Sequence, residues 1–238
     1  MLTKTTLRTL ALGALTTFAV AFSAAGATRI VPADRDATLI EDPDGAMANG
    51  AGAAFFAGRT GTIDKTVRRA LLHFEVATEI GTPLKRPAAA SIDSVALVLT
   101  VTMEPPAAGP REFRLHRLLA DWGEGASSSF GGIGAPAEPG DATWIHTFYP
   151  DAFWMHNGAQ FDGEPSARLI VDGPGVYRFE GEGLLRDVRM WSRDPGRNFG
   201  WILIGDETER QTARAFASRE NPDSSLRPVL EIGFHGRP

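Results

Sequence analysis

The chain has 238 residues, a formal net charge of −5 and no cysteine. The absence of cysteine excludes disulfides, thiolate metal sites and a cysteine nucleophile. The mild acidity argues against nucleic acid as a partner, because binding phosphate needs a concentrated basic surface and the arginines are scattered among acidic residues.

The first residues are typical of a secretory signal peptide. Basic residues precede an apolar run over residues 10–22, which is followed by the small residues 23–27. The run is too short for a membrane span, and small residues at its end are typical of a signal-peptidase site. We expect residues 1–27 to be removed, so that the protein is secreted, extracellular or periplasmic. Residues 28–238 are then expected to form a single domain without a membrane span.

The remaining chain shows many short strand patterns separated by glycine and proline. Residues 92–103 have the clearest two-residue period, with Val95, Leu97, Leu99 and Val101 on one face. Further strands are predicted at 53–57, 67–76, 112–119, 142–148, 167–171, 201–204 and 229–234. This pattern favours an all-β fold, a two-sheet β-sandwich with long loops.

One short helix and one long loop interrupt the strands. Apolar residues recur at helical spacing between Leu184 and Trp191, and Pro195 ends the pattern. Residues 123–140 are rich in glycine, serine, alanine and proline, which predicts a long loop. Because long loops on a rigid sandwich commonly carry binding residues, we expect the functional site near this segment.

A series of short strings follows an order that resembles one protein family. The strings are DATL at 36–39, ANG at 48–50, FFAG at 55–58, RRALLHF at 68–74, WGEG at 122–125, GDATW at 140–144, DV at 187–188, NFGW at 198–201, FASRE at 216–220 and LRPVL at 226–230. The series resembles the DNRLRE domain family, which is similar to bacterial carbohydrate-binding modules with a jelly-roll sandwich fold. The resemblance implies a jelly-roll-like sandwich, a glycan ligand and a structural Ca²⁺ ion.

Acidic and amide side chains that could hold this calcium ion occur in two parts of the chain. The candidate metal ligands are Asp36, Glu41 and Asn49 near the N-terminus, and Asp206 and Glu220 near the C-terminal strands. Calcium takes about six to eight oxygen ligands, usually from loops. The alternative is that these acids are solvated or pair with arginines, because no EF-hand spacing fixes the ligands.

Aromatic residues beside the long loop predict a sugar-binding face. Rings of this kind stack on a pyranose, while polar side chains bond its hydroxyl groups. The candidate ligand-binding residues are Trp122, Glu124, Trp144, Tyr149, Trp154 and Arg117. The alternative is that these rings pack in the core or plug the loop.

Two further chemistries have candidate residues. His146 and His156 could bind a transition metal together with His116 or His73, although such a site needs three or four ligands. A glycosidase would need two opposed carboxylates, for which the candidates are Glu124, Asp141, Asp151 and Asp162.

We therefore expect a secreted, non-catalytic and monomeric module that binds a polysaccharide or cell-surface glycan. A structural matrix or envelope protein that binds another protein is the alternative. A polysaccharide hydrolase or lyase is the third hypothesis, and no catalytic sequence motif supports it.

Overall fold

The computed structural model describes residues 27–61, 66–79, 92–106 and 108–235. The predicted signal peptide lies outside these residues, apart from Ala27. The strands are β1 (Ala27–Pro32), β2 (Arg35–Ile40), β3 (Met47–Asn49), β4 (Ala54–Arg59), β5 (Val67–His73), β6 (Ile92–Met103), β7 (Arg111–Arg117), β8 (Ala135–Pro136), β9 (His146–Phe148), β10 (Ala152–Phe153), β11 (Ala167–Val171), β12 (Gly175–Glu180), β13 (Trp201–Ile204), β14 (Arg214–Ala217) and β15 (Val229–Phe234). The helices are α1 (Val76–Glu79) and α2 (Glu182–Arg193), with short 3₁₀ turns η2 (Pro195–Arg197) and η3 (Ser224–Leu226).

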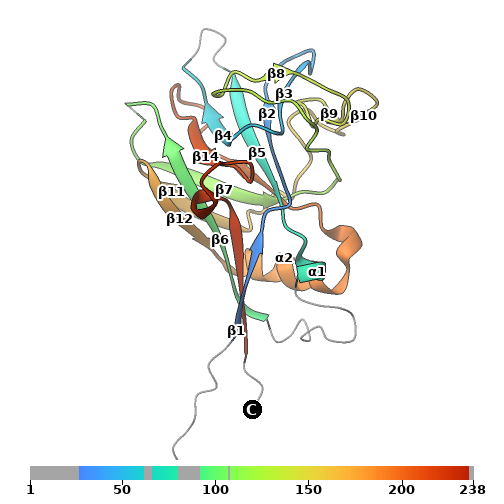
Figure 1. Ribbon diagram of the computed structural model, residues 1–238, viewed down its shortest axis with the longest axis vertical. Helices are drawn as coiled ribbons and strands as arrows, with labels where there is room; N and C mark the ends of the chain where they lie inside the picture. Colours follow the sequence, from blue (N-terminus) through green and yellow to red (C-terminus); the bar gives the residue numbers. More distant parts are fainter. Residues whose placement is uncertain (1–26, 62–65, 80–91, 107, 236–238) are drawn as a thin grey trace, which may run out of the picture.

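The strands form the predicted all-β sandwich, whose two antiparallel layers are seen in Figure 1. We call the layer of β1, β15, β6, β12, β14 and β4 sheet A. Sheet B contains β8, β3, β2, β5, β13, β7 and β11. The end of β4 also pairs with β5, so the hydrogen-bonded network passes from one layer to the other.

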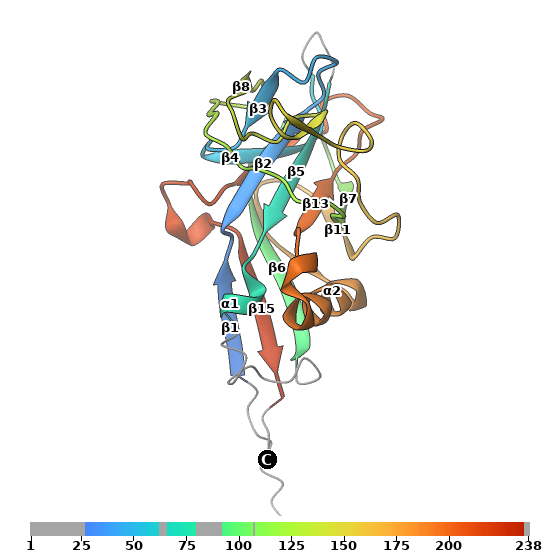
Figure 2. The same ribbon diagram turned by 90° about the vertical axis from the view of Figure 1, so that its right-hand side faces the viewer.

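The main core lies between the two sheets. Leu97 and Leu99 of β6 enter it from sheet A, and Leu72 and Trp201 enter it from sheet B. Helix α2 packs against β6 and α1 (Figure 2). The apolar side of the helix, including Trp191, belongs to the main core. The helix ends at Arg193, just before a proline, whose ring cannot continue it.

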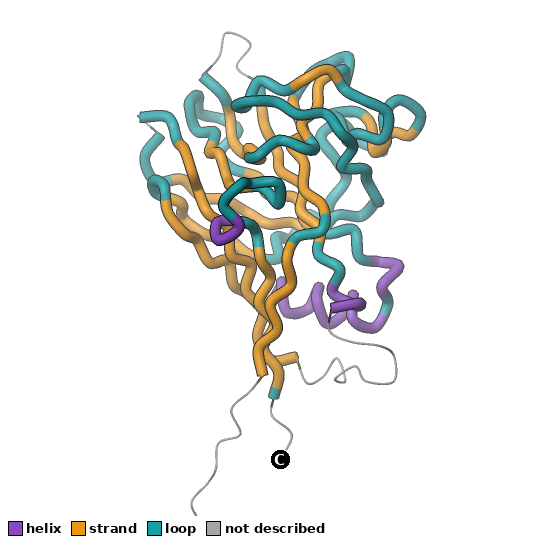
Figure 3. Tube along the Cα trace, in the orientation of Figure 1, coloured by secondary structure: helices purple, strands orange, loops and turns teal. Residues whose placement is uncertain are grey.

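A second core covers the other face of sheet B. Successive residues of a strand point to opposite faces. Leu203 of β13 therefore faces the main core, whereas Ile202 and Ile204 face outward. The long connection from Leu118 to Phe161 lies over that outer face and packs its own side chains there. Figure 3 shows this connection as a thick layer of loops with little regular structure. The central strands β2, β5 and β13 of sheet B are thus buried on both faces.

The predicted elements and the observed ones agree best where apolar alternation is strong. The strands β6, β11, β13 and β15 have the predicted bounds, and the predicted helix is α2. The prediction for 142–148 was wrong over its first half, because this segment turns tightly into the second core and only His146–Phe148 is a strand. Strands β2 and β14 were missed, because charged residues at buried positions break their apolar pattern. In the described part of the chain, no helix is both long and apolar enough to cross a membrane.

Candidate functional site

Two of the four predicted sugar-stacking rings are part of the second core. Trp122 is 0% exposed and Trp154 is 5% exposed. Their indole nitrogens donate to the carbonyl oxygens of Phe199 and Thr143, both at 2.9 Å. The prediction that these two rings present a face to a ligand was therefore wrong. The reason is that the loop folds back over a hydrophobic sheet face, which local sequence patterns do not reveal.

The other two predicted rings are partly buried and lie in different surroundings. Tyr149 packs edge-on against the ring of His146, with 5.0 Å between centroids. Trp144 lies beneath the guanidinium of Arg69, 4.9 Å from the ring centroid. That guanidinium also forms two hydrogen bonds to the Glu207 carboxylate, of 2.7 and 2.9 Å. Because Arg69 is held by a ring and a carboxylate together, its position is fixed.

A cleft of 470 Å³ opens beside Arg69 on the outer side of the loop layer. We call it the outer cleft. Apolar groups and hydrogen-bonding side chains both line it. The apolar residues are Leu119, Met155 and Phe161, and the hydrogen-bonding residues are His156, Asn157 and Gln160. The volume and this mixture are those of a small-ligand site. The single pattern in the sequence that pointed here was the cluster of aromatic residues around the long loop.

Arg117 does not join the aromatic residues. Its guanidinium contacts Asp162 at 2.7 Å and the largely buried Asp187 at 3.3 Å, and it lines a separate polar cleft of 240 Å³. Burial raises the pKa of Asp187, although hydrogen bonds from Ser166 and Trp201 and the charge of Arg117 partly offset this effect. The ion pair therefore joins β7 to helix α2 and has a structural role.

Three acidic residues from distant parts of the chain converge around Arg219. Asp36, Glu124 and Glu220 bring carboxylate oxygens within 4.8 Å of one another. The Arg219 guanidinium bonds both oxygens of Glu124 at 2.7 Å and contacts Glu220 at 2.8 Å. Its backbone N–H donates to Asp36 at 2.7 Å. We call this group the Arg219 cluster.

Electrostatics in the Arg219 cluster disfavour additional negative charge. Burial raises the pKa of Asp36 well above its usual range, and the charges of Glu220 and Glu124 add to the effect. Burial also raises the pKa of Glu220, again with a contribution from Glu124. The hydrogen bond to Glu124 raises the pKa of Arg219, so this side chain stays charged. Arg219 therefore supplies a positive charge at the centre of the cluster.

The five residues predicted to bind calcium do not come together. Only Asp36 and Glu220 meet, whereas the other three have structural partners. Glu41 accepts from the N–H of Val67, Asn49 bridges Ser129 N–H and the Ala54 carbonyl, and Asp206 accepts from the N–H groups of Thr208 and Glu209. Calcium at the remaining pair would compete with the Arg219 guanidinium. The five predicted residues therefore do not form one calcium site. Whether the protein binds calcium at all stays a prediction.

The predicted histidine site does not form either. His146 is buried and bonds Thr143 Oγ1 at 2.8 Å, whereas His156 is exposed on the outer cleft. His116 bonds the backbone carbonyl of Asp162 at 2.8 Å. Neither His146 nor His156 belongs to a group of potential metal ligands within the described residues.

The carboxylates considered for glycosidase chemistry have structural partners in three cases. Asp141 is fully buried and accepts from the N–H groups of Ser127 and Glu138. Glu124 and Asp162 bond arginines, as described above. Asp151 lies exposed in the turn between β9 and β10.

No protein-family model matches the chain, and no curated protein matches its sequence. The resemblance to the DNRLRE family accordingly stays a prediction.

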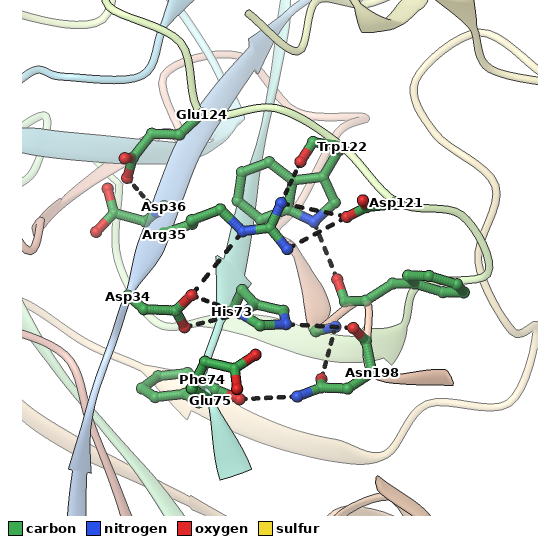
Figure 4. A network of polar contacts seen from close by, with 12 residues as sticks. Asp34, Arg35, Asp36, His73, Phe74, Glu75, Asp121, Trp122, Glu124 and Asn198 are labelled. Atoms are coloured by element: carbon green, nitrogen blue, oxygen red, sulfur yellow. Dashed lines mark hydrogen bonds and ion pairs between the residues drawn. The ribbon is translucent and has the colours of Figure 1, made fainter. Parts of the chain in front are cut away.

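A polar network next to the Arg219 cluster was missed from the sequence (Figure 4). Arg35 contacts Asp121 at 3.2 Å and the Trp122 carbonyl, while Asp34 contacts His73 at 2.7 Å. A polar cleft of 380 Å³, here called the His73 cleft, opens onto these groups. One sequence signal was available. His73 and Glu75 are two residues apart in the segment predicted as a strand (67–76), and residues two apart on a strand share a face.

Proposed function

We propose that this protein is a secreted, non-catalytic module that binds a glycan in the outer cleft. The observation that carries the proposal is the composition of that cleft, where apolar groups and neutral hydrogen-bonding side chains line one concave surface. A sugar presents the same two kinds of surface, C–H faces and hydroxyl groups. The pattern of residues 1–27 supports secretion.

The charge of the cleft favours a neutral glycan. Arg69 is the one arginine among the cleft residues, which include no lysine, and Glu207 already balances its charge through two hydrogen bonds. Asn157 and Gln160 offer amide donors and acceptors without charge. A polyuronate would bring carboxylates to a site that has no spare positive charge, so we expect it to bind more weakly.

Retention on insoluble polysaccharides tests the proposal. We expect the protein to bind at least one neutral polymer among cellulose, chitin and xylan, and to bind alginate less. Asn157→Ala and Met155→Ala should each weaken binding about fivefold or more, since each removes a group that contacts the ligand. Met155 is 75% exposed, so its loss should not disturb the fold.

Met103→Ala is the matched control. Met103 is also exposed, but it lies on sheet A and does not line the outer cleft. Absence of binding to every polymer, or equal loss in the control, would reject the outer cleft as a glycan site. Release of soluble sugar from a bound polymer would indicate a hydrolase or lyase instead of a binding module.

A structural protein that binds another protein is the second candidate, and one surface favours it. An apolar groove of 350 Å³ lies between the end of β6 and the loop at Ile133, with Phe56 at its base. Phe130 beside it is 98% exposed. An apolar surface of this kind is typical of contact between proteins. Loss of a cell-surface protein partner on Ile133→Ser, with glycan retention absent in the unmodified protein, would support this candidate.

A further inference from the structure

We propose that Asp34, His73 and Glu75 form a binding site for a divalent transition-metal ion of the zinc class at the edge of the His73 cleft. Ligand atoms of the three side chains lie within 4.8 Å of one another. One imidazole nitrogen with two carboxylates suits zinc and its neighbours, and water would complete the coordination. The cleft shares no lining residue with the outer cleft, so this site is independent of glycan binding.

The backbone holds the three ligands in place. His73 ends β5, and its carbonyl accepts the backbone N–H of Asp34 at 3.1 Å. Phe74 anchors the segment in the main core, and its carbonyl accepts from the Asn198 side chain at 2.8 Å. Because residues two apart in an extended segment share a face, Glu75 projects on the same side as His73 (Figure 4). The site thus lies where β5 ends and where the chain enters β2.

The contacts of His73 orient its Nδ1 atom toward Asp34. The ring is 3% exposed, and its Nε2 atom lies 3.2 Å from the backbone carbonyl of Asn198. In the tautomer with its proton on Nε2, the ring donates to that carbonyl and offers the Nδ1 lone pair as a ligand. Metal-binding histidines are commonly oriented by such a bond from the second ring nitrogen.

The Nδ1 atom then faces two carboxylate oxygens of Asp34, at 2.7 and 2.9 Å. Without an ion, the ring donates from Nδ1 to Asp34 in its other tautomer. With an ion at the site, Nδ1 and the Asp34 carboxylate would both bind it in place of that hydrogen bond.

Other charged groups facing the site leave room for a cation. Asp34 and Glu75 contribute negative charge, and Asp121 lies across the same cleft. Arg35 provides the opposing positive charge: its guanidinium contacts Asp121 at 3.2 Å and the Trp122 carbonyl, and it lies 4.0 Å from Asp34. Glu75 is exposed, and its carboxylate accepts a hydrogen bond from Thr78 Oγ1 at 3.0 Å. Its carboxylate therefore needs only a side-chain rotation to reach the ion.

Calorimetric titration of the untagged protein with Zn²⁺, together with the visible absorption of added Co²⁺, tests the site. We expect one ion per chain at neutral pH. Glu75→Gln should weaken binding tenfold or more while the fold and the His73–Asp34 contact are retained. His73→Gln should abolish it.

His235→Gln is the matched control, because His235 forms an exposed contact with Asp93 at 2.9 Å and belongs to no group of three potential ligands among the residues that the structure describes. Its affinity for Zn²⁺ should equal that of the unmodified protein. Failure to bind one ion per chain, unchanged affinity in Glu75→Gln, or loss of binding in His235→Gln would each overturn the proposal. Any of these results would assign His73 to an ion pair with Asp34 alone.

Discussion

Replacing Trp122 by alanine distinguishes a structural ring from a ligand-binding one. The side chain is fully buried in the second core, donates to the Phe199 carbonyl and lies 4.9 Å from the guanidinium of Arg35. Truncating a buried tryptophan costs about 3–5 kcal/mol through lost contacts and the remaining cavity. The Phe199 carbonyl loses its partner, at about 1 kcal/mol. We expect the free energy of unfolding to fall by about 4 kcal/mol, near the middle of this range.

Urea unfolding followed by circular dichroism measures this change. For a chain of this size the same loss lowers the Tm by roughly 10 °C. Phe130→Ala is the control, because it also removes an aromatic side chain, but one that is 98% exposed. It should change the free energy of unfolding by less than about 0.5 kcal/mol. If Trp122→Ala is no more destabilised than Phe130→Ala, the second core is not a stabilising part of the fold and the burial argument fails.

Three further predictions concern the Arg219 cluster and its loop. Arg219→Gln should lower the free energy of unfolding by about 2 kcal/mol at pH 7, because its charge-assisted hydrogen bonds to Glu124 are lost. Added Ca²⁺ should raise the Tm of this variant more than the Tm of the unmodified protein. Equal Tm shifts would show that Arg219 does not take the place of a cation. Burial raises the pKa of Asp36, so the native state binds a proton at this carboxyl more tightly than the unfolded state does. The resulting contribution to stability is present below the usual pKa of 3.8 and is lost as the pH rises through the native pKa. Asp36→Asn should therefore remove part of the decline in unfolding free energy between acid and neutral pH, and an unchanged pH profile would contradict this. Gly125→Ala should lower the free energy of unfolding by about 1–2 kcal/mol, since Gly125 has a φ of 68° and an added Cβ would meet the Asp141 carboxylate. A Tm within about 1 °C of the Tm of the unmodified protein would count against this prediction.

Local pattern was sufficient for the fold class but not for the site. The alternation of Leu97, Leu99 and Val101 reflects one strand facing one core, and the spacing of residues in α2 reflects one buried helix side. Neither pattern requires knowledge of a distant partner. The candidate site, in contrast, was predicted from residue types near one loop, and types alone do not tell an exposed tryptophan from a buried one.

The acidic residues illustrate the same limit. Glu124 hydrogen-bonds to Asp36 across 88 positions of the chain and to Arg219 across 95. From the sequence, Asp36 and Glu220 were expected in one site and Glu124 in another, with arginines as the alternative partners of the acids. Arg219 is such a partner of Glu220, at 2.8 Å. Their convergence follows from the pairing of β2 with β5 and from the path of the loop over sheet B.

Local alternation and helical spacing were enough to predict an all-β sandwich with one helix, because successive side chains of a strand point to opposite faces whatever lies beyond them. The covering of both faces of β2, β5 and β13 became visible only in the folded chain. That covering buries Trp122 and Trp154, leaves a mixed apolar and polar cleft beside Arg69, and sets His73 against Asp34. These outcomes depend on which distant surfaces meet, since burial is a property of the folded chain and not of a residue.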